Sequence, residues 1–210
     1  RRLVLPGRNH SGPPVVALAD GGFLVGVEVP TVGSIDGVMI PVGYPLVRLN
    51  SALTVLSAQI RPAVRMDASP TTDLVVRATS TALIGERADG TVLWMQATAP
   101  SDPLLVNVLN DGRIIYVTTL INVQSIFGQS WGVAGMRTIA VAELDSTGTY
   151  LRGRQIPIGG SGVTINPNVA AVSPDGTRIA VAGQSFNAVV SVCGTTVVNG
   201  AAQGSFVFVF

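Results

Sequence analysis

Charge, aromatic residues, cysteine, histidine and lysine are all scarce in this chain. Of its 210 residues, 12% are charged and 5% are aromatic, and lysine is absent, whereas about a quarter of an average soluble domain is charged. This composition excludes a charged helical bundle or coiled coil, which is rich in Glu and Lys. It also excludes an intrinsically disordered chain, because 47% of the residues are hydrophobic and the net charge is only +1.

The few reactive residues limit the chemistry further. Cys193 is the only cysteine and His10 the only histidine, so the chain has neither an intramolecular disulfide nor the usual ligands of a zinc site. We therefore expect no metal and no cofactor. Cys193 lies in an apolar run and is expected to be a small buried core residue. The chain begins with Arg1 rather than Met, and we expect a processed product or a piece of a longer chain.

Two classes of partner are disfavoured by the same scarcity. The 13 basic residues are balanced by 12 acidic ones, which predicts no binding to nucleic acid. The sequence has no run of about 18 apolar residues, which predicts no membrane-spanning helix. A protein partner or a homo-oligomer remains the expected kind of association.

What the chain does contain is a recurring hairpin pattern. Short runs rich in Val, Ile and Leu alternate with turn signals, and helical periodicity is nearly absent. Three hairpins carry an Asp-Gly turn, in which glycine accepts the positive φ of a tight turn; they lie at 15–29, 104–118 and 169–182. Hairpins of a second type follow at 47–57, 84–96 and 138–155, and Phe206–Phe210 resembles the first half of another.

Together the two hairpin types form a repeat of four strands. We place the repeats at 14–60, 72–97, 103–157 and 167–210, with the second compressed and without room for a fourth strand. Internal repeats of about 40–50 residues with four strands are typical of a β-propeller. The sequence therefore predicts an all-β, propeller-like single domain over 1–210, with about four blades, one of them irregular. We also expect Leu3–Leu5 to close the last blade by pairing with Phe206–Phe210, because closure removes open sheet edges.

Two stretches resemble a known repeat. Residues 168–183, which include Ser-Pro-Asp-Gly, and residues 139–151, followed by Ile158-Gly-Gly160, are similar to the SBBP-type bacterial β-propeller repeat. The resemblance covers the third and fourth repeats best. It implies a propeller fold and a secreted or cell-surface bacterial protein, and it implies no shared catalytic motif.

The candidate catalytic residues are few. His10 lies in a Gly- and Pro-rich segment, which favours an exposed linker histidine over a general base. No Asp or Glu occurs in the four predicted inner strands, which are Val15–Ala19, Leu74–Ala78, Leu104–Leu109 and Val169–Val172. These strands therefore cannot provide the paired carboxylates that glycoside hydrolysis requires. Glu28, Glu86 and Glu143 are expected at solvated edges. Each Asp-Gly turn carries one Asp, which favours plain turn chemistry over calcium binding.

The candidate binding residues are aromatic. Trp131 and Phe127 lie in a Gly-rich loop, and Trp94 lies in a predicted strand; we predict these three as interface candidates. The loop over 121–135 and the one holding Val32 and Met39 carry several apolar residues, which are either exposed contacts or side chains that fold back onto the blade.

The leading hypothesis is a non-enzymatic structural or protein-interaction propeller, part of an assembly and outside the cytoplasm. One alternative is a carbohydrate- or small-ligand-binding propeller that uses the loops 30–45, 121–135 and 184–204. A hydrolase is the least favoured alternative, because the required residues are missing. A further possibility is that another chain supplies missing blades.

Overall fold

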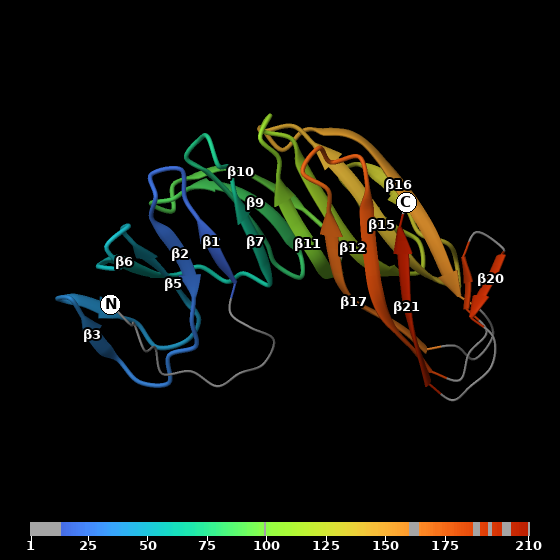
Figure 1. The fold of residues 1–210 in the computed structure, drawn as a ribbon, viewed down its shortest axis with the longest axis horizontal. Helices are drawn as coiled ribbons and strands as arrows, with labels where there is room; N and C mark the ends of the chain where they lie inside the picture. Colours follow the sequence, from blue (N-terminus) through green and yellow to red (C-terminus); the bar gives the residue numbers. More distant parts are fainter. Residues whose placement is uncertain are drawn as a thin grey trace.

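The computed structural model describes residues 14–98, 100–159, 164–186, 190–192, 195–198 and 203–209. Every regular element in this part of the chain is a β-strand. Four antiparallel sheets follow one another along an arch, arranged like the blades of a four-bladed β-propeller (Figure 1). The prediction of an all-β, propeller-like chain with about four blades is confirmed.

The first and second sheets each contain four strands. In spatial order, the first sheet consists of β1 (Val15–Ala17), β2 (Phe23–Gly26), β5 (Pro45–Leu49) and β6 (Val55–Ile60). The second sheet consists of β7 (Arg65–Ala68), β8 (Leu74–Ala78), β9 (Ala82–Arg87) and β10 (Val92–Ala97).

The third and last sheets contain longer strands. The third sheet consists of β11 (Asp102–Val108), β12 (Ile114–Ile121), β15 (Arg137–Leu144) and β16 (Tyr150–Gly159), extended by β19 (Val190–Val192) and β20 (Thr195–Val198). The last sheet consists of β17 (Thr164–Val172), β18 (Ile179–Phe186) and β21 (Gln203–Val209). The first strands of the four sheets, β1, β7, β11 and β17, lie next to one another in that order and form the inner side of the arrangement.

Inserted hairpins interrupt three of the sheets at the same point, between the second and third strands. They are β3 (Gly33–Ile35) with β4 (Val38–Ile40), β13 (Gln124–Ile126) with β14 (Gln129–Trp131), and β19 with β20. The second sheet has only the short turn over 79–81 at this position.

The sheets pack face to face, so that the two faces of a middle sheet contact different neighbours. Side chains alternate between the faces of a strand, and the buried residues separate accordingly into clusters between consecutive sheets. The cluster between the first and second sheets consists of Val16, Leu18, Leu24, Leu46, Met66, Ala68, Val75 and Ala88. Burial on both faces explains why apolar residues exceed what an alternating, half-solvated strand would carry.

The Asp-Gly turns form as predicted. In the first hairpin, Asp20 Oδ1 accepts a hydrogen bond from the Gly22 N–H at 2.9 Å, and Gly21 takes φ +79°. The corresponding glycine of the last sheet, Gly176, takes φ +73°, a conformation that L side chains rarely adopt. The six predicted hairpins are therefore confirmed, each joining the strands expected from its turn.

The second repeat differs from its predicted form. It begins at Arg65 rather than at 72, because Arg65–Ala68 forms the inner strand β7 and pairs along β8. The expectation that this repeat lacks room for a fourth strand is wrong, since its sheet contains four. The strand is only 4 residues long and alternates polar with apolar side chains, so it does not show the small or apolar run predicted for the other inner strands.

The predicted closure falls partly on residues outside the described ranges. Leu3–Leu5 is not among the described residues, so its pairing with the C-terminal strand stays a prediction. The C-terminal strand β21 is the third strand of the last sheet and pairs with β18 from Ala180↔Val209 to Phe186↔Gln203.

Candidate functional site

The last sheet carries an apolar face that no described residue covers. The register aligns Val169 with Ala182 and Val207 across the sheet, and Ala171 with Ala180 and Val209. Val169, Val207 and Val209 are 55%, 67% and 66% exposed. We call these six residues the outward face of the last sheet. Because all six are Val or Ala, they carry no charge and no hydrogen-bonding side chain; the next pair on the same side of the sheet, Gln184↔Ser205, is polar and exposed.

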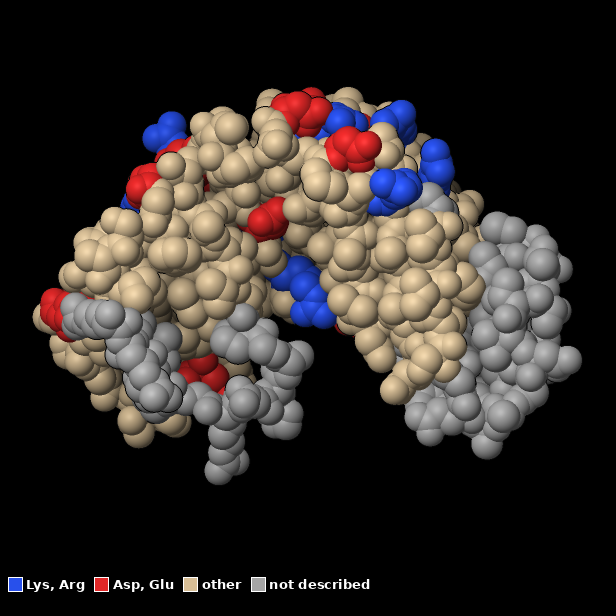
Figure 2. All heavy atoms as spheres, viewed as in Figure 1, with Lys and Arg blue, Asp and Glu red and all other residues tan. Residues whose placement is uncertain are grey.

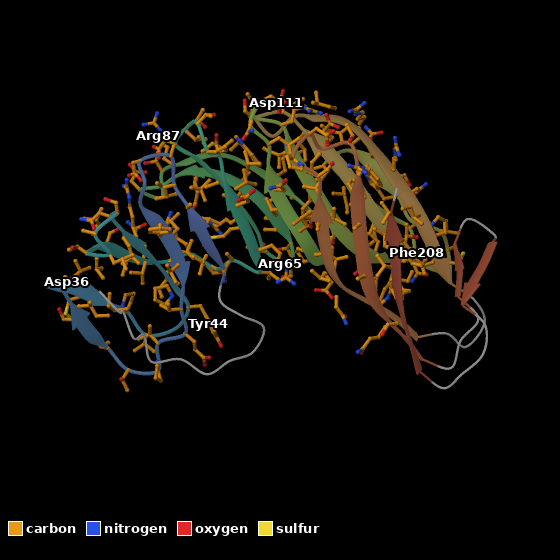
Figure 3. The ribbon with its side chains drawn as sticks, viewed as in Figure 1. Asp36, Tyr44, Arg65, Arg87, Asp111 and Phe208 are labelled. Carbon is orange, nitrogen blue, oxygen red and sulfur yellow. The ribbon has the colours of Figure 1, made fainter. Side chains whose placement is uncertain are left out.

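The opposite face of the same sheet is buried against the third sheet. Ala170, Ile179, Val181 and Phe206 are all less than 9% exposed and pack on the third sheet. The Phe206 ring stacks on the Phe208 ring with 4.7 Å between their centroids, and Phe208 lies near the C-terminal end of β21 (Figure 3). The sheet is thus apolar on both faces, as a middle blade of a propeller is.

The first sheet has a comparable free face at the other end of the arch. The register places Val15 beside Val25, and Ala17 beside Phe23. Val15 is 57% exposed, and Ala17 is also exposed. Phe23 and Val25 are half-buried. We call these four residues the inner part of the first sheet's free face.

The outer part of that free face is covered by the β3–β4 hairpin. Ile40 is 2% exposed and packs with Val47, Leu49 and Val55 of the first sheet. The hairpin tip is held to β6, because Asp36 Oδ2 accepts a hydrogen bond from the Val55 N–H at 2.9 Å; Asp36 marks this tip in Figure 3. The hairpin therefore leaves only the inner part of the face open.

Charged side chains are gathered away from these faces. In Figure 2 the blue and red side chains lie mostly along the top rim of the arch, where the turns are, whereas the surface over β17 and β21 is tan. The described atoms of the first and last sheets stand on the two sides of a hollow in the same view. Apolar faces without charge at both ends of an arch are suited to packing against another protein.

The three predicted interface residues do not form this surface. Trp131 is 4% exposed, its Nε1–H donates to the Ile126 carbonyl at 3.1 Å, and its ring packs edge-on against Tyr150 at 6.1 Å. Phe127 is half-buried and packs edge-on against Tyr116 at 5.9 Å. The expectation that Trp131 is an exposed anchor is wrong, because the loop folds into the β13–β14 hairpin and buries its aromatic side chains on the third sheet.

Trp94 joins two sheets of the same chain. Its Nε1–H donates to the Ser146 carbonyl at 2.9 Å, in the turn that connects β15 with β16. Its ring covers Gly85 and approaches Gly148 so closely that a Cβ at either glycine would overlap it. Trp94 is therefore an internal contact between the second and third sheets.

The apolar residues of the two loops are partly buried and partly exposed, so each of the two alternatives that the sequence left open holds for some of them. Ile40 and Ile126 are buried, whereas Val32, Met39, Ile121 and Val123 are more than half exposed. Both loops form hairpins, so the reading in which they fold back onto their blades holds for the buried residues.

The inner strands contain a carboxylate that the sequence analysis missed. Because β7 rather than Leu74–Ala78 is the inner strand of the second sheet, Asp67 lies on the inner side. Asp67 Oδ2 accepts from Asn107 Nδ2 at 2.7 Å and from the Val108 N–H at 2.8 Å. In the same strand, Arg65 Nε donates to the Leu104 carbonyl at 3.0 Å, and Figure 3 shows Arg65 on the underside of the arch, at the lower end of β7. These groups tie β7 to β11, so their hydrogen-bonding capacity serves the fold.

Glu86 is buried, which corrects its predicted place at a solvated edge. It is 0% exposed and lies between two guanidinium groups: Arg61 Nη1 is 2.8 Å from Oε1, and Arg77 Nε is 3.0 Å from Oε2. Arg77 also donates to the Pro62 carbonyl at 2.8 Å. Burial lowers the pKa of Arg61, and the charge of Glu86 opposes that shift. We call this group the Arg61–Glu86–Arg77 triad; it ties the connection between the first two sheets to the second sheet.

Glu143 is also more enclosed than predicted. It is 9% exposed and accepts from Arg113 Nη1 at 2.9 Å and from Arg152 Nε at 2.8 Å. Burial raises its pKa, but the two guanidinium groups prevail and hold it below its usual value. A carboxylate kept ionised by two arginines is unsuited to act as a general acid.

One polar cavity of about 440 Å³ opens between turns of the first two sheets. Its lining includes Asp20, Arg48, Thr72 and Asp73. Arg48 Nη2 lies 2.7 Å from Asp20 Oδ2, and the Gly22 N–H and Arg48 hold the pKa of Asp20 below its usual value. The described residues that line the cavity include no aromatic ring on which a sugar could stack, and the cavity lies outside the loops proposed for ligand binding.

The remaining candidates are His10, Cys193 and clusters of metal-binding side chains. His10 and Cys193 lie outside the described residues. In the part of the chain that the structure describes, no three His, Cys, Asp or Glu side chains come together as a metal site. None of the described residues forms a helix with the length and apolar character that crossing a membrane requires.

No protein-family model matches the chain, and no curated protein matches its sequence. The resemblance to the SBBP-type repeat therefore stays a prediction from the sequence.

Proposed function

We propose that this protein is a non-enzymatic interaction module that associates with other copies of this chain through the outward face of its last sheet. One observation carries the proposal: a patch of six Val and Ala residues on one face of the sheet, whose three valines are 55–67% exposed, and which no described residue covers. An exposed apolar patch of this kind marks an interface in soluble proteins, and covering it releases free energy in proportion to its area.

The charges and polar groups support a structural role over a catalytic one. The most enclosed carboxylates, Glu86 and Glu143, are each bound by two arginines, and Asp67 is bound to the neighbouring strand. Each of these groups holds strands or sheets together. We also propose that the protein acts outside the cytoplasm, which rests only on the resemblance to secreted SBBP-type repeat proteins.

The experiment is to measure the mass of the purified chain by sedimentation as its concentration rises. We expect species heavier than the 21.6 kDa chain, and we expect Val207→Asp to return the mass to that of the single chain, because burying an unpaired carboxylate is costly. Val92→Asp is the matched control, since Val92 is 55% exposed on β10, away from this face. A wild-type chain that stays at 21.6 kDa at every concentration would overturn the proposal.

Binding of a small polar ligand is the second candidate, and the cavity at Asp20 and Arg48 is the observation that favours it. The ligand would have to compete with their ion pair. Calorimetric titration with neutral mono- and oligosaccharides tests this function: heat that disappears in Arg48→Met supports it, and no heat with any of them counts against it.

A further inference from the structure

We propose that the partner on the outward face of the last sheet is the first sheet of a second copy of this chain, packed head to tail. This inference rests on the proposed function and names the surface of the second copy that takes part. It follows from the way consecutive sheets already pack within the chain.

Each internal interface joins the same two kinds of face. The second sheet presents Leu74, Val76 and Ala78 to the third sheet, which receives them on a face that includes Val106 and Tyr116. The third sheet presents its opposite face, with Ile115 and Val117, to the last sheet. We call a face that packs on the following sheet a presenting face, and a face that packs on the preceding sheet a receiving face. By the same order, the outward face of the last sheet is a presenting face, and the free face of the first sheet is a receiving face.

The inserted hairpins identify the receiving face independently. In the third sheet, the β13–β14 hairpin covers the outer part of the receiving face, where the Trp131 ring lies on Gly153 of β16. In the first sheet, the β3–β4 hairpin covers the same outer part, where Ile40 packs with Val47 and Val55. The inner part of the third sheet's receiving face is filled by the preceding sheet.

The inserted hairpin of the last sheet also lies toward the preceding sheet. The β19–β20 hairpin pairs with the outer strand of the preceding, third sheet, through Ile158↔Val192 and Gly159↔Ser191. Inserted hairpins thus lie toward the preceding sheet. The β3–β4 hairpin and the exposed Val15 and Ala17 are built toward a preceding sheet that the described residues do not supply.

The two free faces also match in chemistry. The outward face of the last sheet carries only Val and Ala, and the inner part of the first sheet's free face carries Val15, Ala17, Phe23 and Val25. Neither face bears a charge, so neither places an unpaired ion in the interface. Because the two faces belong to opposite ends of the arch, the contact is heterologous, and it closes into a ring when the rotation between copies allows it.

The experiment measures association of single-face variants by sedimentation. We expect Val207→Asp alone and Val15→Asp alone each to lose the closed assembly, and an equimolar mixture of the two variants to recover a heavier species through the one contact in which both faces are intact. Val92→Asp alone, in which both faces are intact, is the control for a charge placed elsewhere, and we expect it to associate as the wild type does.

The possible results separate this inference from the proposed function. If Val207→Asp abolishes association and Val15→Asp leaves it unchanged, the last sheet binds its own counterpart or another surface of a second copy, and the head-to-tail arrangement is wrong while the proposed function stands. If wild type is a single chain throughout, both are wrong. A bismaleimide cross-link between copies carrying Val207→Cys and Val15→Cys, in a Cys193→Ser background, supports head-to-tail packing; cross-linking only between two Val207→Cys copies contradicts it.

Discussion

The two end sheets of the arch differ in how much of the face that they turn outward is covered. Both end sheets have one face buried in the chain and one face turned outward. At the first sheet, an inserted hairpin covers the outer strands, and Val47 and Leu49 beneath it are 0% and 4% exposed. At the last sheet, the inserted hairpin also lies toward the preceding sheet and pairs with it, so it does not cover the outward face, whose valines stay more than half exposed. Because the inserted hairpins lie toward the preceding sheet, they cover part of the first sheet's free face and leave the outward face of the last sheet available to a partner.

The largest expected effect concerns the Arg61–Glu86–Arg77 triad, which ties the connection between the first two sheets to the second sheet. Glu86→Gln removes the charge between Arg61 and Arg77 and leaves two buried guanidinium groups without a counterion, so we expect a loss of about 3–5 kcal/mol in unfolding free energy. Urea denaturation measures it. Glu28→Gln, at a half-buried position, is the control.

A rescue variant distinguishes the charge effect from a defect in shape. Replacing all three members together, as Arg61→Met, Arg77→Met and Glu86→Leu, removes every buried charge, and we expect it to restore most of the stability. If Glu86→Gln alone lowers the unfolding free energy by less than about 1 kcal/mol, the triad does not hold the first two sheets together.

The next effect compares the two covering hairpins. Trp131→Ala removes the indole between the β13–β14 hairpin and the third sheet, and we expect a loss of about 3–5 kcal/mol. Ile40→Ala removes the corresponding side chain of the β3–β4 hairpin, and we expect about 2–4 kcal/mol. Urea midpoints rank the two. Equal stability of Trp131→Ala and wild type would contradict the burial of this residue and favour its role as an exposed anchor.

A smaller effect separates the two faces of the last sheet. Val181 is 0% exposed and faces the third sheet, whereas Val207 is 67% exposed on the outward face. Val181→Ala removes two buried methyl groups, and we expect a loss of roughly 2 kcal/mol. Val207→Ala should stay within about 0.5 kcal/mol at concentrations where the chain is single. If the two variants lose the same amount in thermal denaturation, the assignment of the faces is wrong.

The smallest effect concerns acid sensitivity of the turns. The Ser173 hydroxyl and the Thr177 N–H lower the pKa of Asp175 to about 2. A carboxyl whose pKa is lowered on folding stabilises the fold above its unfolded pKa of about 3.9, and this stabilisation is lost as the pH falls toward the folded value. We therefore expect urea midpoints to decline between about pH 4 and about pH 2, and Asp175→Asn to decline less. A pH profile of Asp175→Asn that matches wild type would exclude this contribution.

Most of the fold could be predicted from the sequence, because its signals are local. Asp-Gly turns between β-branched runs define hairpins, and their spacing defines four repeats. The inner strand β7 was missed because Arg65 and Asp67 interrupt its apolar pattern, and both are there to bind β11. The burial of Glu86 could not be predicted, since its partner Arg61 is 25 residues away in the chain.

The sequence predicted that the candidate site is apolar, but it did not predict which residues form it. The scarcity of charge indicated an apolar surface, and the sequence pointed to aromatic residues as its anchors. The structure buries Trp131 and uses Trp94 between sheets, while Val207 and Val209 remain exposed. Alternating apolar residues look the same whether a sheet face meets another sheet or solvent, so only the order of the sheets in space reveals which face is free.

The most direct measurement is the reactivity of a thiol placed on the outward face. With Val207→Cys in a Cys193→Ser background, we expect the rate of reaction with a small thiol reagent to fall as protein concentration rises, because association covers the face. Val92→Cys in the same background should react at a constant rate. A Val207→Cys thiol that reacts equally fast at low and high concentration would contradict the claim that this face is where the protein associates.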